Sequence, residues 1–278
     1  MNPSFAPGAP LFLIAGPCAL ESRELAMRTA ERLRAICAAR GLPLIFKGSF
    51  DKANRTSGDA GRGAGMDEGL RVLEEVRREF ALPVLTDVHW PAQAETVAAV
   101  ADVLQIPAFL CRQTDLIAAC AKSGRAVNIK KGQFLSPREM LRAAAKAESF
   151  GAREILLCER GASFGYNNLV ADMRSLVVLR ESRRPVVFDA THSAQLPGAE
   201  GGGSGGQREM ILPLARAAAA TGIDGIFVET HPDPRRAISD SATQWPLDGM
   251  DSFLAQVLAI DGARRAAESE FAAPAESE

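Results

Sequence analysis

The stretch PLIFKGSFDKANRTS, residues 43–57, changes character abruptly at Lys47. Its first four residues are apolar, and the rest hold two lysines, one arginine, one asparagine and three hydroxyl side chains. A short apolar run followed by such a loop is typical of a strand that delivers polar groups to a surface. Lysine and arginine beside serine, threonine and asparagine suit phosphate and carboxylate oxygens. A basic loop taken alone is more often simply solvated, so its meaning depends on the rest of the chain.

The same pattern of a short apolar strand followed by a helix repeats eight times. The predicted strands cover residues 11–15, 43–47, 83–86, 103–106, 126–130, 154–158, 185–189 and 225–229. The predicted helices cover residues 21–40, 66–80, 91–101, 113–122, 136–150, part of 168–181, 207–220 and 249–267. Eight such units in 278 residues predict a single (β/α)8 barrel of the TIM type, with its active site at the carboxyl ends of the strands.

The domain organisation follows from the same pattern. Residues 1–10 carry three prolines and are expected to form an N-terminal arm, residues 11–270 the barrel, and residues 271–278 a flexible tail. An open doubly wound sheet is the alternative, but it needs fewer strands or an added domain. The sequence has neither a dinucleotide fingerprint nor a GxxxxGK phosphate loop.

Composition narrows the possible partners and the compartment. The net charge of −2 gives no reason to expect nucleic acid or an acidic membrane as a partner. The five cysteines are scattered, which is typical of a reducing compartment. The apolar residues 11–15 are too few to span a bilayer. We therefore expect a cytoplasmic protein.

Polar side chains cluster at one end of the predicted strands. In strand order they are Cys18; Lys47, Ser49, Lys52, Asn54 and Arg55; Asp87 and His89; Arg112 and Gln113; Lys130 and Lys131; Glu159 and Arg160; Asp189 and His192; and Glu229, His231, Asp233 and Asp240. The loops at the opposite ends, such as Ala81-Leu82 and Gly222-Ile223, are short and carry no such set of side chains. Because barrel enzymes build their active sites at the carboxyl ends of the strands, this asymmetry indicates catalysis.

Six of these side chains are cations: Lys47, Lys52, Arg55, Arg112, Lys130 and Arg160. Crowded like charges are costly unless an anion is bound among them. The set therefore predicts substrates with several anionic groups, such as two phosphates and a carboxylate. Alternatively, Asp51, Asp87 and Glu159 neutralise the cations in structural ion pairs.

A second set consists of Cys18, His192, Glu229 and Asp240. Thiolate, imidazole and carboxylate together suit a divalent ion such as zinc, iron, manganese or cobalt. The alternative is that Cys18 is a small buried residue and that His192 only forms hydrogen bonds.

Residues 195–206 are rich in glycine. Such a composition predicts a flexible chain. At the active end of a barrel it is either a lid that closes over substrate or a disordered surface insertion.

Several motifs together resemble the 3-deoxy-D-manno-octulosonate 8-phosphate synthase family. They are IAGPCALES at 14–22, KANRTS at 52–57, TDVH at 86–89, IPAFLCRQTDL at 106–116, NIKK at 128–131, ERGASFGY at 159–166 and FDATHS at 188–193. The resemblance runs from about Leu11 to Leu247. It implies a barrel enzyme, usually a homotetramer, that condenses phosphoenolpyruvate with arabinose 5-phosphate and releases phosphate, for lipopolysaccharide sugar synthesis.

The resemblance also implies roles for individual residues. The enolpyruvate phosphate would meet Arg160, Lys130 and the backbone at Ala108, and its carboxylate would meet Lys52 and Ser49, with Lys47, Gln105 and Arg112 nearby. The pentose phosphate would meet Arg55 and Thr56, and Asn54 would contact the sugar. Lys52, Lys130 and His192 join the implied catalytic set, in which Asp87, His89 or Asp240 could move protons.

Two details of the motifs distinguish branches of this family. Heptulosonate phosphate synthases typically have Lys-Pro-Arg where this chain has Lys-Ala-Asn-Arg at 52–55, so the resemblance favours a five-carbon acceptor. The metal-independent branch has Asn at the position of Cys18, whereas this chain has Cys18 and the segment AISDSATQ at 237–244, as in the metal-dependent branch. A catalytically silent barrel that only binds sugar phosphates is the remaining alternative.

Overall fold

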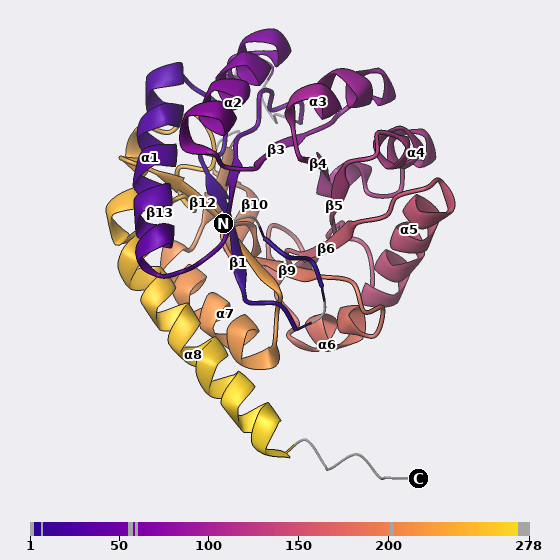
Figure 1. Ribbon diagram of the computed structural model, residues 1–278, viewed down its shortest axis with the longest axis vertical. Helices are drawn as coiled ribbons and strands as arrows, with labels where there is room; N and C mark the ends of the chain where they lie inside the picture. Colours follow the sequence, from indigo (N-terminus) through magenta and orange to yellow (C-terminus); the bar gives the residue numbers. More distant parts are fainter. Residues whose placement is uncertain (1–2, 7, 55–57, 59–60, 201–202, 272–278) are drawn as a thin grey trace.

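The computed structural model describes residues 3–6, 8–54, 58, 61–200 and 203–271. Within them, eight parallel strands close into a barrel inside a ring of helices, as predicted (Figure 1). The first and last barrel strands pair along their length, from Phe12 opposite Gly225 to Gly16 opposite Glu229. In order around the barrel, the strands are β1 (Phe12–Gly16), β2 (Leu44–Lys47), β3 (Val84–Asp87), β4 (Val103–Ile106), β5 (Ala126–Lys130), β6 (Ile155–Glu159), β9 (Val186–Asp189) and β12 (Gly225–His231).

Two of the helices begin at serine caps. The side chain of Ser22 accepts a hydrogen bond from the Leu25 amide at 3.1 Å, and Ser136 forms a reciprocal capping box with Glu139. A short 3₁₀ turn, η1 (Pro91–Gln93), opens the third helical unit. The α-helices are α1 (Arg23–Ala39), α2 (Met66–Phe80), α3 (Ala94–Val100), α4 (Thr114–Lys122), α5 (Pro137–Ser149), α6 (Arg174–Arg180), α7 (Arg208–Thr221) and α8 (Met250–Phe271).

Alternate residues of each strand separate two cores. In β1, Leu13 and Ala15 pack outward in the core that lies under the helices, while Phe12 and Ile14 belong to a smaller core inside the barrel. The inner core takes further members from the other strands: Ile45, Leu85, Val103, Ala126, Leu156, Cys158, Val187 and Phe227. Because side chains alternate with period two, the next inward position toward each carboxyl end is polar or glycine, and these positions form the floor of the site.

Gly16 is the inward position of β1 at this level. A Cβ atom on Gly16 would lie 1.9 Å from the Lys47 carbonyl oxygen. Only glycine therefore allows β1 and β2 to approach this closely, and the approach places the Lys47 side chain beside the loop that follows β1.

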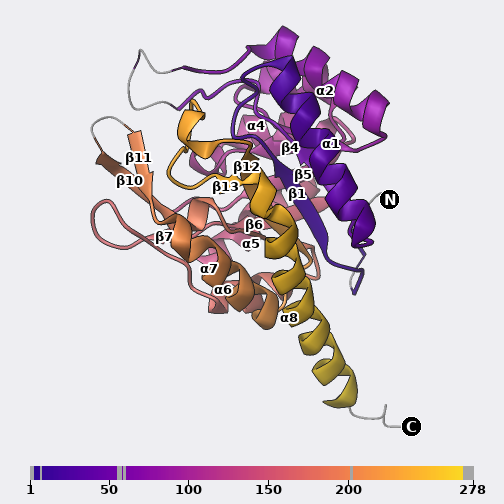
Figure 2. The same cartoon turned by 90° about the vertical axis from the view of Figure 1, so that its left-hand side faces the viewer.

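In the glycine-rich segment, the described residues form an antiparallel hairpin of β10 (Gln195–Glu200) and β11 (Gly203–Gly206), which disagrees with the disordered insertion and leaves the lid as a prediction. A Cβ atom at Gly206 would lie 2.1 Å from Thr243 Cγ2, so this glycine allows the hairpin to pack against the segment after β12. Figure 2 shows the hairpin on the side of the barrel opposite the N-terminus.

The helix predicted within 168–181 is confirmed as α6, and the structure adds short elements that were not predicted. Before α6, β7 (Ala162–Ser163) and β8 (Leu169–Val170) pair as a second small hairpin. The strand β13 (Trp245–Pro246) adds to the end of β12. Short 3₁₀ turns follow several strands: η2 (Ala108–Leu110), η3 (His192–Ala194), η4 (Pro234–Arg236) and η5 (Leu247–Gly249). Among the helices described here, none is both long and apolar enough to cross a bilayer.

Candidate active site

The thiol and carboxylate residues predicted as metal ligands meet at the carboxyl end of the barrel. Ligand atoms of Cys18, Glu229 and Asp240 lie within 4.8 Å of one another. The Cys18 thiol donates to Asp240 Oδ2 at 2.9 Å, and Asp240 adopts a left-handed backbone conformation with φ of 50°. His192 lies beside this cluster. Its Nδ1 is 2.7 Å from Asp189 Oδ2, and its Nε2 is 3.6 Å from Glu229 Oε2.

Burial controls the protonation of this cluster. Burial, and then the charges of Asp240 and Glu229, raise the pKa of the Cys18 thiol well above its usual value. Burial also acts to raise the pKa of Glu229, but Lys47, His192 and Lys52 outweigh it and hold that pKa well below its usual range. Without a bound ion the cluster therefore combines a neutral thiol with an ionised Glu229.

Lys47 is the counter-charge of Glu229. Its Nζ donates to Glu229 Oε1 at 2.5 Å and to the carbonyl oxygens of Pro17 and Cys18 at 3.3 and 2.7 Å. Both charged side chains are 1% exposed. All three ammonium protons have an acceptor, so Lys47 fixes Glu229 and the loop after β1.

Four inward side chains form a continuous chain of hydrogen bonds across β5, β4, β3 and the end of β2. Asn128 Nδ2 donates to Gln105 Oε1 at 2.7 Å, and Gln105 Nε2 donates to Asp87 Oδ1 at 2.5 Å. Ser49 Oγ donates to Asp87 Oδ2 at 2.5 Å and accepts from Lys52 Nζ at 3.2 Å. The chain locks the orientation of Lys52, which also lies 3.8 Å from Glu229 Oε1.

Asp87 and His89 differ in their capacity to move protons. Burial acts to raise the pKa of Asp87, but Lys52 and Lys47 hold it far below its ordinary range, so Asp87 is a fixed anion. Burial lowers the pKa of His89 from its ordinary 6.5, so the ring is neutral near pH 7. Within the described residues, the buried Nδ1 atom of His89 has no hydrogen-bond partner. His89 is therefore able to accept a proton.

Lys130 lies on the opposite side of the mouth. It donates to Asp189 Oδ2, lies 3.4 Å from His192 Nδ1, and has its Nζ 3.6 Å from the centroid of the Phe227 ring. Burial acts to lower the pKa of Lys130, but Asp189, Cys158 and Glu229 together outweigh it and raise that pKa, so the ammonium stays charged.

Arg160, directly after β6, is held by one end of its guanidinium. Its Nη2 donates to Gln195 Oε1 at 2.6 Å. Its Nη1 is buried and has no hydrogen-bond partner in the part of the chain that the structure describes. Such an orphaned charged donor is suited to an anionic oxygen of a ligand.

The other predicted substrate residues lie at the rim. Ala108 begins η2 and is half-buried, whereas Asn54 and Arg112 are exposed. Arg55 and Thr56 lie outside the described residues. Three of the predicted cations form ion pairs, as in the alternative prediction, but with other carboxylates. Lys47 and Lys52 pair with Glu229, and Lys130 pairs with Asp189.

Comparison with known proteins identifies the family. A sequence model described as the DAHP synthetase I family matches residues 6–262. The chain belongs to this family.

Curated relatives cover nearly the whole chain. A protein of Acidithiobacillus ferrooxidans is 62% identical over 252 residues, which are 91% of this chain and 90% of the relative. A protein of Methylobacillus flagellatus is 58% identical over 254 residues, 91% of each chain, and one of Methylococcus capsulatus is 58% identical over 252 residues, 91% of this chain and 89% of the relative. All three are named 2-dehydro-3-deoxyphosphooctonate aldolase. These findings confirm the resemblance to the octulosonate phosphate synthase family.

The donor set of this family member fits a divalent ion. With Nδ1 of His192 directed at Asp189, Nε2 carries a lone pair toward the cluster, an arrangement typical of metal-ligating histidines. Glu229 Oε2 is buried and, among the described residues, without a hydrogen-bond partner, although it lies 3.6 Å from His192 Nε2. Two carboxylates and a thiol thus lie close enough together to share one ion, and the imidazole of His192 lies beside them.

Sequence reasoning missed two glutamines that organise the site. Gln195 bridges Arg160 and Asp240, and the fully buried Gln244 accepts from the Cys18 amide at 3.2 Å and donates to the Ser239 carbonyl at 2.9 Å. Their positions after β9 and β12 were the available signal. A neutral amide, unlike a charged side chain, does not by itself indicate an ionic ligand.

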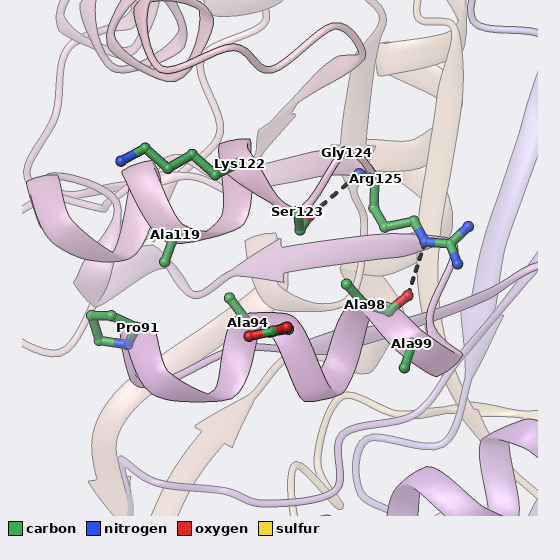
Figure 3. A pocket seen from close by; sticks show the side chains of 10 residues that line it. Pro91, Ala94, Ala98, Ala99, Ala119, Lys122, Ser123, Gly124 and Arg125 are labelled. Atoms are coloured by element: carbon green, nitrogen blue, oxygen red, sulfur yellow. Dashed lines mark hydrogen bonds between the residues drawn. The ribbon is translucent and has the colours of Figure 1, made fainter.

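A surface groove lies away from this site. It has a volume of about 710 Å³ and runs between α3 and α4, lined by alanines and by Glu95, Lys122 and Arg125. Figure 3 shows Arg125 reaching across it, where Nε donates to the Ala98 carbonyl at 2.9 Å. This groove therefore has no part in the chemistry at the barrel mouth.

Proposed function

We propose that this chain condenses phosphoenolpyruvate with D-arabinose 5-phosphate and water to give 3-deoxy-D-manno-octulosonate 8-phosphate and inorganic phosphate, in lipopolysaccharide sugar synthesis. The observation that carries the proposal is the mouth of the barrel. There the buried cations Lys130 and Arg160 and the partly buried Lys52 lie at the same end of the barrel as the cluster of Cys18 and Glu229. The names of the relatives support the same reaction.

The cations divide between the groups of phosphoenolpyruvate. Arg160 and Lys130, with the backbone of Ala108, bind its phosphate, and Lys52 and Ser49 bind its carboxylate. Near the carboxylate, Gln105 holds Asp87 in place and Lys47 holds Glu229 in place. Arg112 approaches the same group from the rim. Asn54 receives the sugar, and Arg55 and Thr56 its phosphate. Holding two anions together that would otherwise repel is the main contribution of these side chains.

Cys18, His192, Glu229 and Asp240 would hold a divalent metal ion, zinc, iron, manganese or cobalt. The bound ion supplies a Lewis acid that polarises or orients the aldehyde, or that lowers the pKa of a water molecule. The chain itself holds this group of ligands in place through Lys47 and Asp189, which bind Glu229 and His192.

The chemistry requires a new carbon–carbon bond, a new carbon–oxygen bond from water and one broken carbon–oxygen bond. The enol carbon of phosphoenolpyruvate attacks the aldehyde, whose oxygen takes up a proton; water adds at C2 and gives up a proton; and phosphate leaves with the oxygen that had joined it to C2. Lys130 and Arg160 stabilise the departing phosphate, since both stay cationic beside it. His89 accepts the proton from water. Asp87 is too weak a base for this step, because two hydrogen bonds stabilise its anionic form.

The role of His89 predicts an acid limb in the pH profile. Because burial lowers its pKa below 6.5, kcat/KM should be flat near pH 7 and fall as the pH drops below that lowered pKa. His89→Gln should reduce kcat by about 10²–10⁴-fold and remove the limb. Rates measured between pH 5 and 8 test this. An unchanged acid limb in the variant would assign it to another group.

The reaction itself is tested by phosphate release from phosphoenolpyruvate, with arabinose 5-phosphate and erythrose 4-phosphate compared as acceptors. We expect turnover with the pentose phosphate and little with the tetrose phosphate. Prolonged chelation should abolish turnover, and adding back a single divalent metal should restore it. Preference for erythrose 4-phosphate would identify a heptulosonate synthase, and tight phosphoenolpyruvate binding without release from either acceptor would identify a silent barrel. Activity that remains after thorough chelation would exclude the metal role, and so would activity that remains in Cys18→Asn.

The proposed assembly is a cytoplasmic homotetramer in which residues 11–270 are one catalytic domain. Aromatic side chains gather on the loops after β4, β5 and β6, where Phe109, Phe134, Phe164 and Tyr166 are all more than half exposed. Such a patch is typical of an interface. Light scattering in solution measures the mass, and a monomeric mass would contradict the tetramer.

A further inference from the structure

The side chain of Gln195 connects two parts of the site that the proposed function treats separately. Its Oε1 accepts from Arg160 Nη2 at 2.6 Å, and its Nε2 donates to Asp240 Oδ1 at 2.5 Å. A guanidinium can only donate and an ionised carboxylate can only accept, so the orientation of the amide is determined. No other uncharged side chain of this length offers one acceptor and two donors at its tip.

The backbone of Gln195 is well placed for such a link. The residue caps η3, which begins at His192, and it is the first residue of β10. Arg160 follows β6 and Asp240 follows β12, so one buried amide joins loops from three strand ends. Gln195 also pairs with Gly206 at the base of the hairpin, which ties the hairpin to the same contact.

Each bond made by Gln195 leaves a partner atom directed into the site. On Arg160 it occupies Nη2, while Nη1 is the orphaned donor described above. On Asp240 it occupies Oδ1, while Oδ2 faces the Cys18 thiol at 2.9 Å. The amide thus decides which nitrogen faces the substrate phosphate and which oxygen faces the thiol.

We propose that Gln195 is a positioning residue that aligns Arg160 with the substrate phosphate and Asp240 with a divalent ion, and that it couples the two binding events. The proposal rests on the proposed function. Because such coupling is reciprocal, phosphoenolpyruvate should tighten metal binding by the same factor by which the metal tightens phosphoenolpyruvate binding.

Two variants separate the bonds. Gln195→Met removes both. We expect about tenfold weaker phosphoenolpyruvate binding from the lost charge-assisted bond, and about 10–100-fold weaker metal binding from the lost ligand-orienting contact. Gln195→Glu keeps an acceptor for Arg160 but places a carboxylate against Asp240. It should therefore weaken metal binding while leaving phosphoenolpyruvate affinity within about threefold of the parent chain.

Two titrations of the purified, metal-free chain measure these affinities. Binding of Co²⁺ is monitored by thiolate charge-transfer absorption, and binding of phosphoenolpyruvate is measured by calorimetry. Gln207→Met is the matched control, because Gln207 is an exposed glutamine that lies just after β11. It should change neither affinity. Circular dichroism checks that each variant is folded.

The outcomes are distinct from those of the activity assay. Unchanged Co²⁺ and phosphoenolpyruvate affinities in Gln195→Met, or equal losses in Gln207→Met, overturn the proposal. If Gln195→Met does not fold, Gln195→Glu decides: a loss confined to Co²⁺ supports the proposal, and an equal loss of both ligands overturns it. A parent chain that binds both ligands but releases no phosphate refutes the proposed function alone.

Discussion

Replacing Lys47 by methionine should lower the free energy of unfolding by about 3–5 kcal/mol, the cost of leaving a buried charge without its partner. Glu229 would keep its charge in a site that is 1% exposed and would lose its contact at 2.5 Å. The carbonyl oxygens of Pro17 and Cys18 would lose a donor at the same time. Urea unfolding of the metal-free chain, at one protein concentration, measures the change.

Two further variants define what this loss means. In Lys47→Met/Glu229→Met both charges are removed, and most of the lost stability should return, because a buried pair is often no better than apolar side chains. Arg138→Met breaks the exposed pair of Arg138 and Glu181 at 3.5 Å and should cost no more than about 1 kcal/mol. A cost for Lys47→Met as small as that of Arg138→Met would contradict the expectation.

Lys130→Met should reduce kcat/KM for phosphoenolpyruvate by about 10²–10³-fold, as expected for a charged donor lost from a buried site. The change removes the cation between Asp189, His192 and the Phe227 ring. Asp189, fully buried, would then repel the substrate phosphate. Initial rates at a temperature well below the unfolding transition of the variant measure the effect.

Lys122→Met is the control for Lys130→Met. Lys122 is an exposed lysine at the end of α4, and it lines the groove that lies away from the site. Its replacement should leave kcat/KM within about twofold, as expected for a surface change. A similar loss in both variants, or a rate unchanged by Lys130→Met, would remove Lys130 from the site.

Local pattern was sufficient to predict the barrel. Each strand is a short apolar run, and caps such as Ser22 and the Ser136 box fix where helices begin. Elements that depend on tertiary contacts were not predictable in this way. The 195–206 hairpin has glycines where a strand would ordinarily carry branched side chains, and one of them, Gly206, packs on Thr243.

The candidate site was predictable as a set but not as a network. Position after a strand located Lys47, Lys130 and Glu229 at one end of the barrel. Which charges pair depends on the register and tilt of strands far apart in sequence, as when Lys47 meets Glu229 across 182 positions. Gln195 accepts a hydrogen bond from Arg160 and donates one to Asp240, and the spacing of residues in the sequence does not predict such a pair of contacts.

The seam between β1 and β12 has a consequence for how the chain is made. Cys18 emerges early from the ribosome, but Asp240 follows it 222 positions later. Until β12 has been synthesised, β1 and β9 each expose an unpaired edge, which is prone to association with other chains. The thiol and its carboxylate neighbours thus come together only after nearly all of the chain has been translated, and no nascent fragment that lacks β12 holds the complete ligand set.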